Sequence, residues 1–118
     1  MFELGRDKIF RGKSEFNKVY SKGRSLANRE MVIYILEDET LRGKVGFAAG
    51  KKLGCAVVRN RVKRLLREAY RLNQNNIKPN CKLILVGRKN LVDAKCDVAI
   101  KSFRELCKRA KIWIDSND

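Results

Sequence analysis

The segment that decides the fold reads Arg59-Asn60-Arg61-Val62-Lys63-Arg64-Leu65-Leu66-Arg67-Glu68. In and around it, apolar residues recur at spacings of four and three, at Val58, Val62, Leu65, Ala69 and Leu72. At about 100° per residue, this spacing predicts an amphipathic helix with one apolar stripe for packing. The opposite face of that helix carries the cations Arg59, Lys63, Arg64, Arg67 and Arg71.

This helix carries far more positive than negative charge. From Lys51 through Arg71 there are eight basic residues and one acidic residue, Glu68. A solvated helix normally interleaves acidic with basic residues at i,i+4, so an ordinary solvent face is the weaker interpretation. The stronger one is a face that binds phosphate groups, because a guanidinium grips phosphate oxygens in a bidentate fork.

The whole chain has the same imbalance, with 28 Lys and Arg against 13 Asp and Glu and a formal net charge of +15 over 118 residues. This charge favours a polyanionic partner, and we expect nucleic acid rather than an anionic membrane. No run approaches the roughly 20 apolar residues that span a bilayer. Residues 1–7 also lack the layout of a signal peptide, so we expect a cytoplasmic protein with no membrane partner.

The flanking segments predict a single domain, residues 1–118, that mixes helices and strands. Strands are expected at residues 31–36, 44–49 and 82–87, which are rich in apolar and β-branched side chains. The first two flank a polar turn at residues 37–43, which predicts an antiparallel hairpin. Further helices are expected at residues 14–22, capped by Ser14 and ended by Gly23, and beyond Asp93. The predicted fold class is therefore α+β.

The residue inventory argues against a protein enzyme. The chain has no histidine, the commonest general acid or base, so we expect no catalytic residue. The acidic run at residues 37–39 falls in the expected turn, where carboxylates are solvated, and we expect no metal site there. Without a Cys-x-x-Cys pair, we expect buried hydrophobes rather than disulfides or a zinc site at Cys55, Cys81, Cys96 and Cys107.

Three aromatic residues, Phe16, Tyr20 and Tyr34, have two interpretations. For isolated rings, packing in the core is the default. Beside basic loops, the same rings suit single-stranded RNA, because bases stack on rings while phosphates pair with cations. The pair Arg88-Lys89 either extends the positive surface or belongs to a solvated loop.

These segments together resemble a known family, the protein component of bacterial ribonuclease P. The resemblance spans nearly the whole chain and is carried by Phe16-x-x-Val19-Tyr20 with Gly23, Arg24-Ser25-Leu26-Ala27-Asn28-Arg29, Tyr34, Lys51-Lys52-Leu53-Gly54, Ala56 through Glu68, and Arg88-Lys89. Two positions depart from the family pattern. Tyr20 stands where many relatives have phenylalanine, and Asn90 follows Arg88-Lys89 where proline is often seen.

The resemblance implies an α+β sandwich of the order α-β-β-β-α-β-α, with a four-stranded sheet and a left-handed β-α-β crossover. Sequence pattern alone favours a right-handed crossover. The resemblance also implies one additional short strand near residues 24–28, which the pattern does not show.

The resemblance further implies two RNA-binding surfaces. The surface that faces the catalytic RNA would comprise Lys51, Lys52, Arg59, Asn60, Arg61, Lys63, Arg64 and Arg67. The cleft that holds the single-stranded 5′ leader of precursor tRNA would be lined by Phe16, Tyr20 and Tyr34, extended by Arg88 and Lys89.

In function, the resemblance implies an RNA-binding subunit that assists a catalytic RNA in the endonucleolytic removal of 5′ leaders from precursor tRNA. The chain would hold no cofactor, Mg²⁺ would be bound by the RNA subunit, and DNA would not be a partner. The alternative from another class is a structural ribosomal RNA-binding protein, which would share the size, charge and mixed fold. A nuclease that uses its own carboxylates is a third hypothesis.

Overall fold

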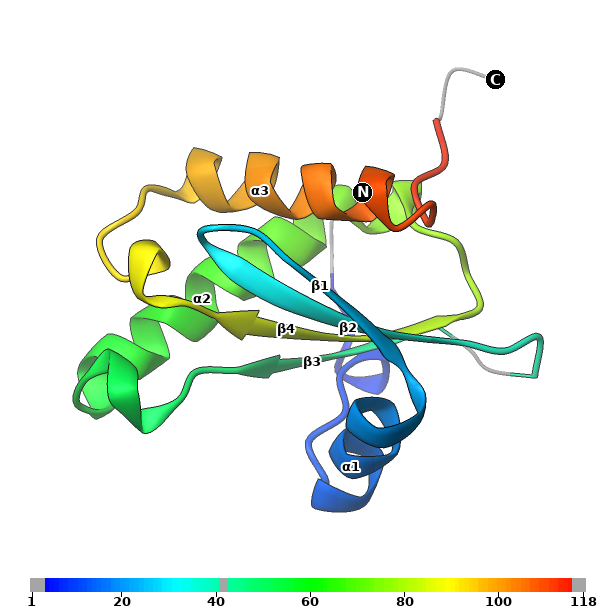
Figure 1. The fold of residues 1–118 in the computed structure, drawn as a ribbon, viewed down its shortest axis with the longest axis horizontal. Coiled ribbons are helices and arrows are strands. Elements are labelled where there is room, and N and C mark those ends of the chain that lie inside the picture. Colours follow the sequence, from blue (N-terminus) through cyan, green and yellow to red (C-terminus); the bar gives the residue numbers. More distant parts are fainter. Residues whose placement is uncertain (1–3, 41–42, 116–118) are drawn as a thin grey trace.

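The computed structural model describes residues 4–40 and 43–115, and within them the chain forms three α-helices and four strands (Figure 1). In chain order these are α1 (Lys13–Lys22), β1 (Arg24–Ala27), β2 (Met31–Glu37), β3 (Lys44–Ala48), α2 (Ala56–Asn73), β4 (Cys81–Gly87) and α3 (Cys96–Arg109). Short 3-10 turns lie at η1 (Arg6–Lys8), η2 (Lys51–Leu53), η3 (Gln74–Asn76) and η4 (Lys89–Leu91). The predicted α+β class, its element order and the short strand near residues 24–28 are confirmed.

The first helix starts differently from the prediction. Gly12 occupies the cap position of α1 and Ser14 lies inside the first turn, so the prediction of Ser14 as the cap is wrong. The predicted end is correct, because the backbone N–H of Gly23 donates to the carbonyl of Val19.

The sheet has the strand order β1-β2-β4-β3. Strand β2 pairs antiparallel with both β1 and β4, whereas β3 pairs parallel with β4. The predicted hairpin between β2 and β3 is therefore wrong, because β4 lies between them. Three successive residues of β4, Leu83, Ile84 and Leu85, are buried, so both faces of this strand are covered, as is typical of a central strand.

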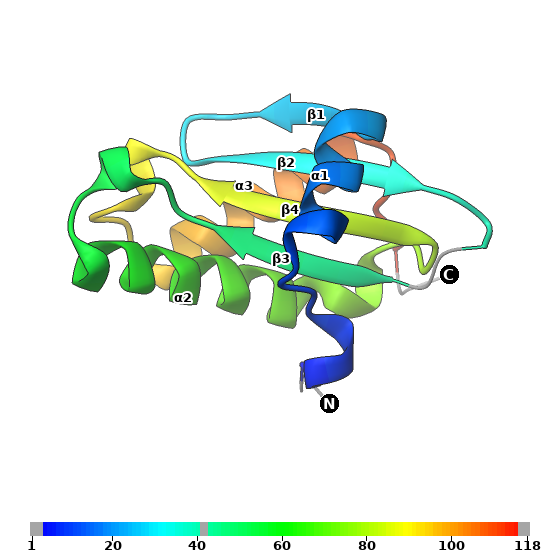
Figure 2. The ribbon, with the colours of Figure 1, turned by 90° about the horizontal axis from the view of Figure 1, so that it is seen from below.

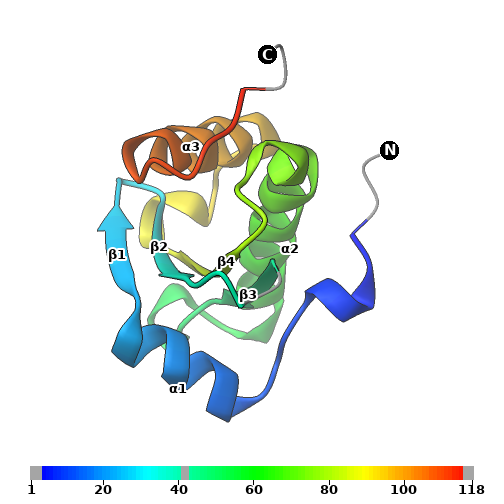
Figure 3. The ribbon, with the colours of Figure 1, turned by 90° about the vertical axis from the view of Figure 1, so that its right-hand side faces the viewer.

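The connection from β3 through α2 to β4 is a left-handed crossover. In Figure 2, which looks onto the α1 side of the sheet, β3 and β4 both run from right to left and β4 lies above β3. Figure 3 shows that α2 lies on the far side of the sheet from α1. The handedness implied by the resemblance is confirmed, and the general preference for right-handed crossovers does not hold here.

The two faces of the sheet are covered unequally. Helices α2 and α3 both pack on one face, while α1 alone lies across the other (Figures 1 and 3). Alternate residues of the strands point to opposite faces. Met31, Ile33 and Ile35 of β2 therefore join Leu66 of α2 and Phe103 of α3 in the main core.

The buried stripe of α2 differs from the predicted one. Val62 and Ala69 are buried as predicted, whereas Val58, Leu65 and Leu72 are only half-buried. Because α2 packs against α3 as well as the sheet, its buried side is shifted around the helix. The positions that complete it are Leu66, Tyr70 and Asn73.

The four cysteines are free thiols in different environments. Cys81 and Cys107 are buried as predicted, and Cys96 is half-buried. Cys55 is exposed, contrary to prediction, because it occupies the cap position before α2, where the chain turns at the surface. In the described segments, no helix is both long and apolar enough to cross a membrane.

Candidate RNA-binding site

The side of the sheet that faces α1 bears a small second core. Tyr34 and Leu36 of β2 and Ile84 of β4 point to this side, where Val19 of α1 packs on them. The alternate residues of the same strands point to the other side of the sheet and belong to the main core. The predicted aromatic residues are therefore attached to a layer that is separate from the main core.

The rings on this side form a continuous row, which we call the aromatic row. Ring centroids are separated by 5.0 Å for Phe10 and Phe16, 6.0 Å for Phe16 and Tyr20, and 4.7 Å for Tyr20 and Tyr34. Phe10 is buried, Phe16 and Tyr34 are half-buried, and Tyr20 is 39% exposed. The structure thus brings Phe16, Tyr20 and Tyr34 together and leaves ring surface open. Partial burial, and then the neighbouring Tyr34, raise the pKa of Tyr20, which keeps its hydroxyl neutral near pH 7.

A glycine allows two of these rings to pack on the sheet. A Cβ atom at Gly46 of β3 would lie 2.6 Å from Cζ of Phe16 and 2.8 Å from Cε2 of Phe10. Any larger residue would therefore push these rings off the strand.

A hollow of about 640 Å³ opens between the aromatic row, β3 and α2. Phe10, Phe16 and Arg11 line one part of it, and the backbone segment Phe47–Ala49 lines another. The wall from α2 is formed by predicted residues, namely Asn60, Lys63, Arg64 and Arg67. One groove therefore combines an aromatic ring with a row of cations. We refer to this hollow as the groove.

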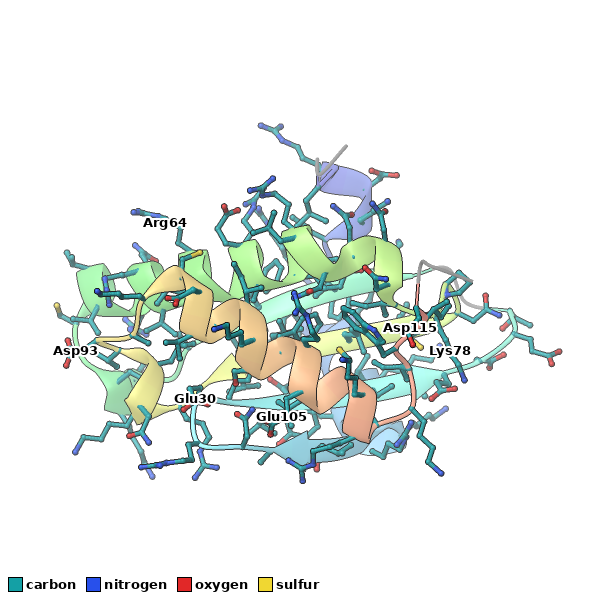
Figure 4. All side chains as sticks on the ribbon, turned by 90° about the horizontal axis from the view of Figure 1, so that it is seen from above. Glu30, Arg64, Lys78, Asp93, Glu105 and Asp115 are labelled. Atoms are coloured by element: carbon teal, nitrogen blue, oxygen red, sulfur yellow. The ribbon has the colours of Figure 1, made fainter. Side chains whose placement is uncertain are left out.

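Three cations of α2 are available to a ligand. Lys63, Arg64 and Arg67 are exposed and form no salt bridge with any described residue. Figure 4 shows Arg64 pointing away from α3. Glu68, the acid of this segment, is instead held by Arg71, whose Nε lies 2.7 Å from Oε2, and this hydrogen bond lowers the pKa of Glu68.

Two other predicted arginines of α2 have different surroundings. The guanidinium of Arg61 donates to the carbonyl oxygens of Val92 and Ala94, which ties α2 to the loop before α3. Arg59 is half-buried, and its buried Nε has no hydrogen-bond partner in the described part of the chain. Arg61 therefore has a structural contact of a kind that Lys63, Arg64 and Arg67 do not make with any described residue.

The remaining predicted cations gather at one end of the sheet. Lys51 and Lys52 lie in η2, and Lys52 lines a hollow together with Lys89. Arg88 and Lys89 also line a second hollow, beside Arg29. Arg88 is four residues beyond Ile84, the partner of Tyr34, which is about 13 Å along the strand. These cations are thus separate from the aromatic row, and the two predicted RNA surfaces meet at Lys52 and Lys89.

The acidic run at residues 37–39 is engaged in local contacts. Glu37 pairs with Arg24 at 2.9 Å, and Asp38 accepts hydrogen bonds from the backbone and hydroxyl of Thr40. These two bonds lower the pKa of Asp38. Within residues 4–40 and 43–115, no group of three or more potential metal ligands is assembled.

Sequence reasoning missed some residues around the groove. Arg11 lines it, and Nζ of Lys82 lies 3.6 Å from Oε2 of Glu15 and 6.0 Å from the ring centroid of Phe10. The alternation of β4 would have placed Lys82 on the same face as Ile84. No sequence signal reveals Arg11, because its position depends on the N-terminal segment, in which Ile9 forms a parallel bridge with Val45 of β3.

The fold and the groove define a class of protein: a small, strongly basic α+β protein in which a groove beside β3 brings an aromatic ring close to cations of α2 that form no salt bridge with any described residue. This combination suits single-stranded RNA. The family profile described as Ribonuclease P matches residues 4–111. The chain belongs to the ribonuclease P protein component family.

Individual relatives agree with this assignment. The ribonuclease P protein component of Clostridioides difficile (strain 630) is 42% identical over 95% of this chain and 99% of its own length. The one from Alkaliphilus oremlandii is 48% identical over 71% of this chain and 74% of its own length. The solved RNase P protein of Staphylococcus aureus superposes with a TM-score of 0.79 at 29% identity, covering 90% of this chain and 97% of that one.

Membership of the family settles the broad function. The chain is a protein subunit of ribonuclease P, the ribonucleoprotein endoribonuclease of tRNA processing, and it works with an RNA subunit. The ribosomal alternative is set aside by this assignment.

Proposed function

We propose that this subunit binds the catalytic RNA through the cations of α2 and the single-stranded 5′ leader of precursor tRNA across the aromatic row. The observation that carries the proposal is the groove, in which Phe16 on one side faces Asn60, Lys63, Arg64 and Arg67 on the other. Bases of the leader stack on ring faces regardless of sequence, and the cations of α2 on the other side of the groove bind phosphates of the catalytic RNA. Duplex RNA would not suit the aromatic row, because its bases are already stacked.

The cationic face of α2 would act mainly through electrostatics. Two RNA molecules repel each other, and a protein with a net charge of +15 between them lessens that repulsion. The aromatic row would add discrimination, because mature tRNA has no leader to stack there. Release of the mature tRNA is favoured for the same reason, because it has no leader to hold it on the aromatic row.

In this proposal the phosphodiester bond is hydrolysed by the RNA subunit. Mg²⁺ bound by that RNA would supply the activated water and the stabilisation of charge. The protein, which has no histidine, contributes binding and positioning. We place this activity in the cytoplasm, with no role for DNA or a membrane.

A reconstitution experiment tests the proposal. Purified protein is mixed with the catalytic RNA, and cleavage of precursor tRNA is measured across a magnesium titration. The protein alone should not cleave, and adding it to the RNA should lower the magnesium concentration that cleavage needs. Cleavage by RNA-free protein that survives nuclease treatment of the preparation would overturn the proposal.

A further inference from the structure

Helix α3 is held to the rest of the protein along two of its sides. Its inner side packs in the main core, where Oγ of Ser102 accepts a hydrogen bond from Nδ2 of Asn28 at 2.7 Å. On the side toward β1, Nη1 of Arg109 donates to the carbonyl oxygen of Ala27 at 3.2 Å. Figure 4 looks onto the remaining, outer side, where the side chains are exposed to solvent.

The outer side carries a row of three cations, Lys101, Arg104 and Lys108, which we call the α3 stripe. At about 100° and 1.5 Å per residue, these positions lie within about 60° of one another around the helix and span about 10 Å along it. All three side chains are exposed, and none forms a salt bridge with any described residue. The α3 stripe is therefore available to an anionic ligand.

The two acids of α3 do not offset this charge. Oε1 of Glu105 lies 3.8 Å from Nη1 of Arg109, on the side of the helix toward β1 (Figure 4). Asp97 lies in the first turn, where the positive end of the helix dipole favours a carboxylate. The negative end favours cations in the last turn, but two of the three cations of the α3 stripe lie before that turn. Neither the pairing of acids nor the helix dipole accounts for the whole stripe.

Two of these cations converge on one indole ring. Cζ of Arg104 lies 5.7 Å from the ring centroid of Trp113, and Nζ of Lys108 lies 5.6 Å from it. A cation is attracted to the π electrons of such a ring, so the ring holds both charges near each other. Oδ1 of Asp115 accepts a hydrogen bond from Nε1 of Trp113 at 3.1 Å. One carboxylate against two cations leaves an excess of positive charge at the ring.

The ring of Trp113 is itself fixed in place by the backbone. Ile77 and Trp113 form an antiparallel bridge. Beside it, the N–H of Ile114 donates to the carbonyl of Asn76 at 2.6 Å, and Nδ2 of Asn76 donates to the carbonyl of Ile114 at 2.7 Å. Trp113 is half-buried against the main core. A fixed ring orients the two cations in advance, which lowers the entropic cost of binding an anion between them.

We propose that the α3 stripe is a further RNA-binding surface, which binds the phosphate backbone of base-paired RNA. Arg104 and Lys108 bind one phosphate between them, and Lys101 binds a neighbouring one. Trp113 is a positioning residue that acts through Arg104 and Lys108. This inference goes beyond the proposed function, which gives α3 no contact with RNA.

The chemistry of the α3 stripe favours a duplex over a single strand. The cations cover the ring of Trp113, so the ring does not serve as a stacking platform for an unpaired base. A duplex needs no such platform, because its bases are already stacked and its phosphates line the outside. The duplex would be a helix of the catalytic RNA or the body of the tRNA, which present the same phosphate backbone.

The experiment compares Arg104→Gln with Arg109→Gln as the matched control. Both variants remove one positive charge from α3, but the guanidinium of Arg109 faces β1 and is engaged by Glu105 and Ala27. A lost charge-assisted hydrogen bond to phosphate should weaken RNA binding by about tenfold or more for Arg104→Gln. The log-log salt slope should fall by about 0.9 for one duplex phosphate. Melting curves establish that both variants are folded.

Two titrations identify the duplex: protein with catalytic RNA alone, and mature tRNA with holoenzyme assembled at saturating protein. A loss in the first supports a helix of the catalytic RNA as the ligand, and a loss in the second supports the tRNA body. If Arg104→Gln and Arg109→Gln have equal effects in both titrations, the α3 stripe does not bind RNA. A loss seen only when a leader is added would also overturn the proposal, because it would indicate a single strand.

Arg64→Gln on α2 keeps this inference separate from the proposed function. If Arg64→Gln weakens catalytic RNA binding and Arg104→Gln changes neither titration beyond the control, only the α3 stripe is wrong. If Arg104→Gln weakens RNA binding and Arg64→Gln does not, the α3 stripe stands and the role proposed for the cations of α2 is wrong.

A double-mutant cycle tests the positioning role of Trp113. Trp113→Leu should weaken RNA binding in the wild-type background and have little further effect when Arg104 and Lys108 are both replaced by Gln. Equal losses in both backgrounds would mean that Trp113 only supports the fold. Trp113→Phe, whose ring attracts cations less strongly than indole does, replaces Trp113→Leu in the cycle if that variant does not fold.

Discussion

The two faces of the sheet are made by the same strands and have opposite character. Toward α2 and α3, the strand residues Met31, Ile33, Ile35, Leu83 and Leu85 are almost completely buried. Toward α1, several of the residues that alternate with them stay half-buried, among them Val32, Tyr34, Leu36 and Val86. The single helix α1 leaves part of its face of the sheet uncovered, whereas α2 and α3 together cover the opposite face.

This difference separates folding from binding within single strands. We call the side of the sheet toward α2 and α3 the closed face and the side toward α1 the open face. Removing a side chain from the closed face leaves a cavity, because its surroundings are packed on all sides. Removing one from the open face removes surface that a ligand would use. A residue and its neighbour in the chain should therefore have different phenotypes.

The largest expected effect is on folding, from Leu85→Ala on the closed face. Leu85 is fully buried, and its truncation should lower the free energy of unfolding by about 2–5 kcal/mol. Val86→Ala on the open face should cost clearly less. Urea denaturation followed by the fluorescence of Trp113, the single tryptophan, measures both. Equal losses would show that the open face is as tightly packed as the closed one.

The next effect is on binding, from Tyr34→Ala on the open face. If a base stacks on this ring, precursor tRNA binding by the holoenzyme should weaken by about 1–3 kcal/mol, and mature tRNA binding should not change. Tyr34→Phe, which keeps the ring, is the control. The ring belongs to the core instead if Tyr34→Ala and Phe16→Ala melt early and lose both RNAs equally.

A smaller effect compares two arginines of α2. Arg64→Gln should reduce the salt slope of catalytic RNA binding by about 0.7 to 0.9, with little change in stability. Arg61→Gln should mainly lower the melting temperature, because it releases the carbonyls of Val92 and Ala94. RNA titrations at several salt concentrations, together with melting curves, measure both. The reverse pattern would contradict the division of roles on α2.

The smallest effect concerns thiol reactivity. The nearby backbone N–H groups of Val58 and Val57, at the start of α2, lower the pKa of the exposed Cys55, so more of it is thiolate at a given pH. Burial raises the pKa of Cys81 to about 11 and also raises that of Cys107. A thiol reagent at pH 7 to 8 should label Cys55 first and reach Cys81 and Cys107 only on unfolding. Mass spectrometry of the labelled sites checks the order.

Much of this architecture could be predicted because it depends on local pattern. The spacing of apolar residues located α2, and β-branched runs located β2, β3 and β4. The cationic residues Lys63, Arg64 and Arg67 followed from the same helical period. Each of these features depends on residues that lie close together in the sequence, within one or two helical turns or within one strand.

What could not be predicted depends on contacts between distant segments. The polar turn after β2 suggested a hairpin between β2 and β3. In the structure β4 lies between these two strands, because its apolar side chains need cover on both faces and its backbone needs a paired strand on each edge. The uninterrupted apolar run Leu83-Ile84-Leu85-Val86 was a signal for a central strand. The tether of Arg61 and the bonds of Asn28 to α3 have no signal in the sequence, because each joins residues far apart in the chain.

The central claim is that the open face of the sheet binds the single-stranded leader, and site-directed photo-crosslinking tests it most directly. A photoreactive phenylalanine analogue replaces the exposed Tyr20 in one variant and the exposed Lys101 of α3 in another. Each variant is assembled with the catalytic RNA and precursor tRNA and then irradiated. The account predicts crosslinks from position 20 to leader nucleotides and none to the leader from position 101. Crosslinks to the leader from position 101, or from position 20 to the tRNA body alone, would contradict it.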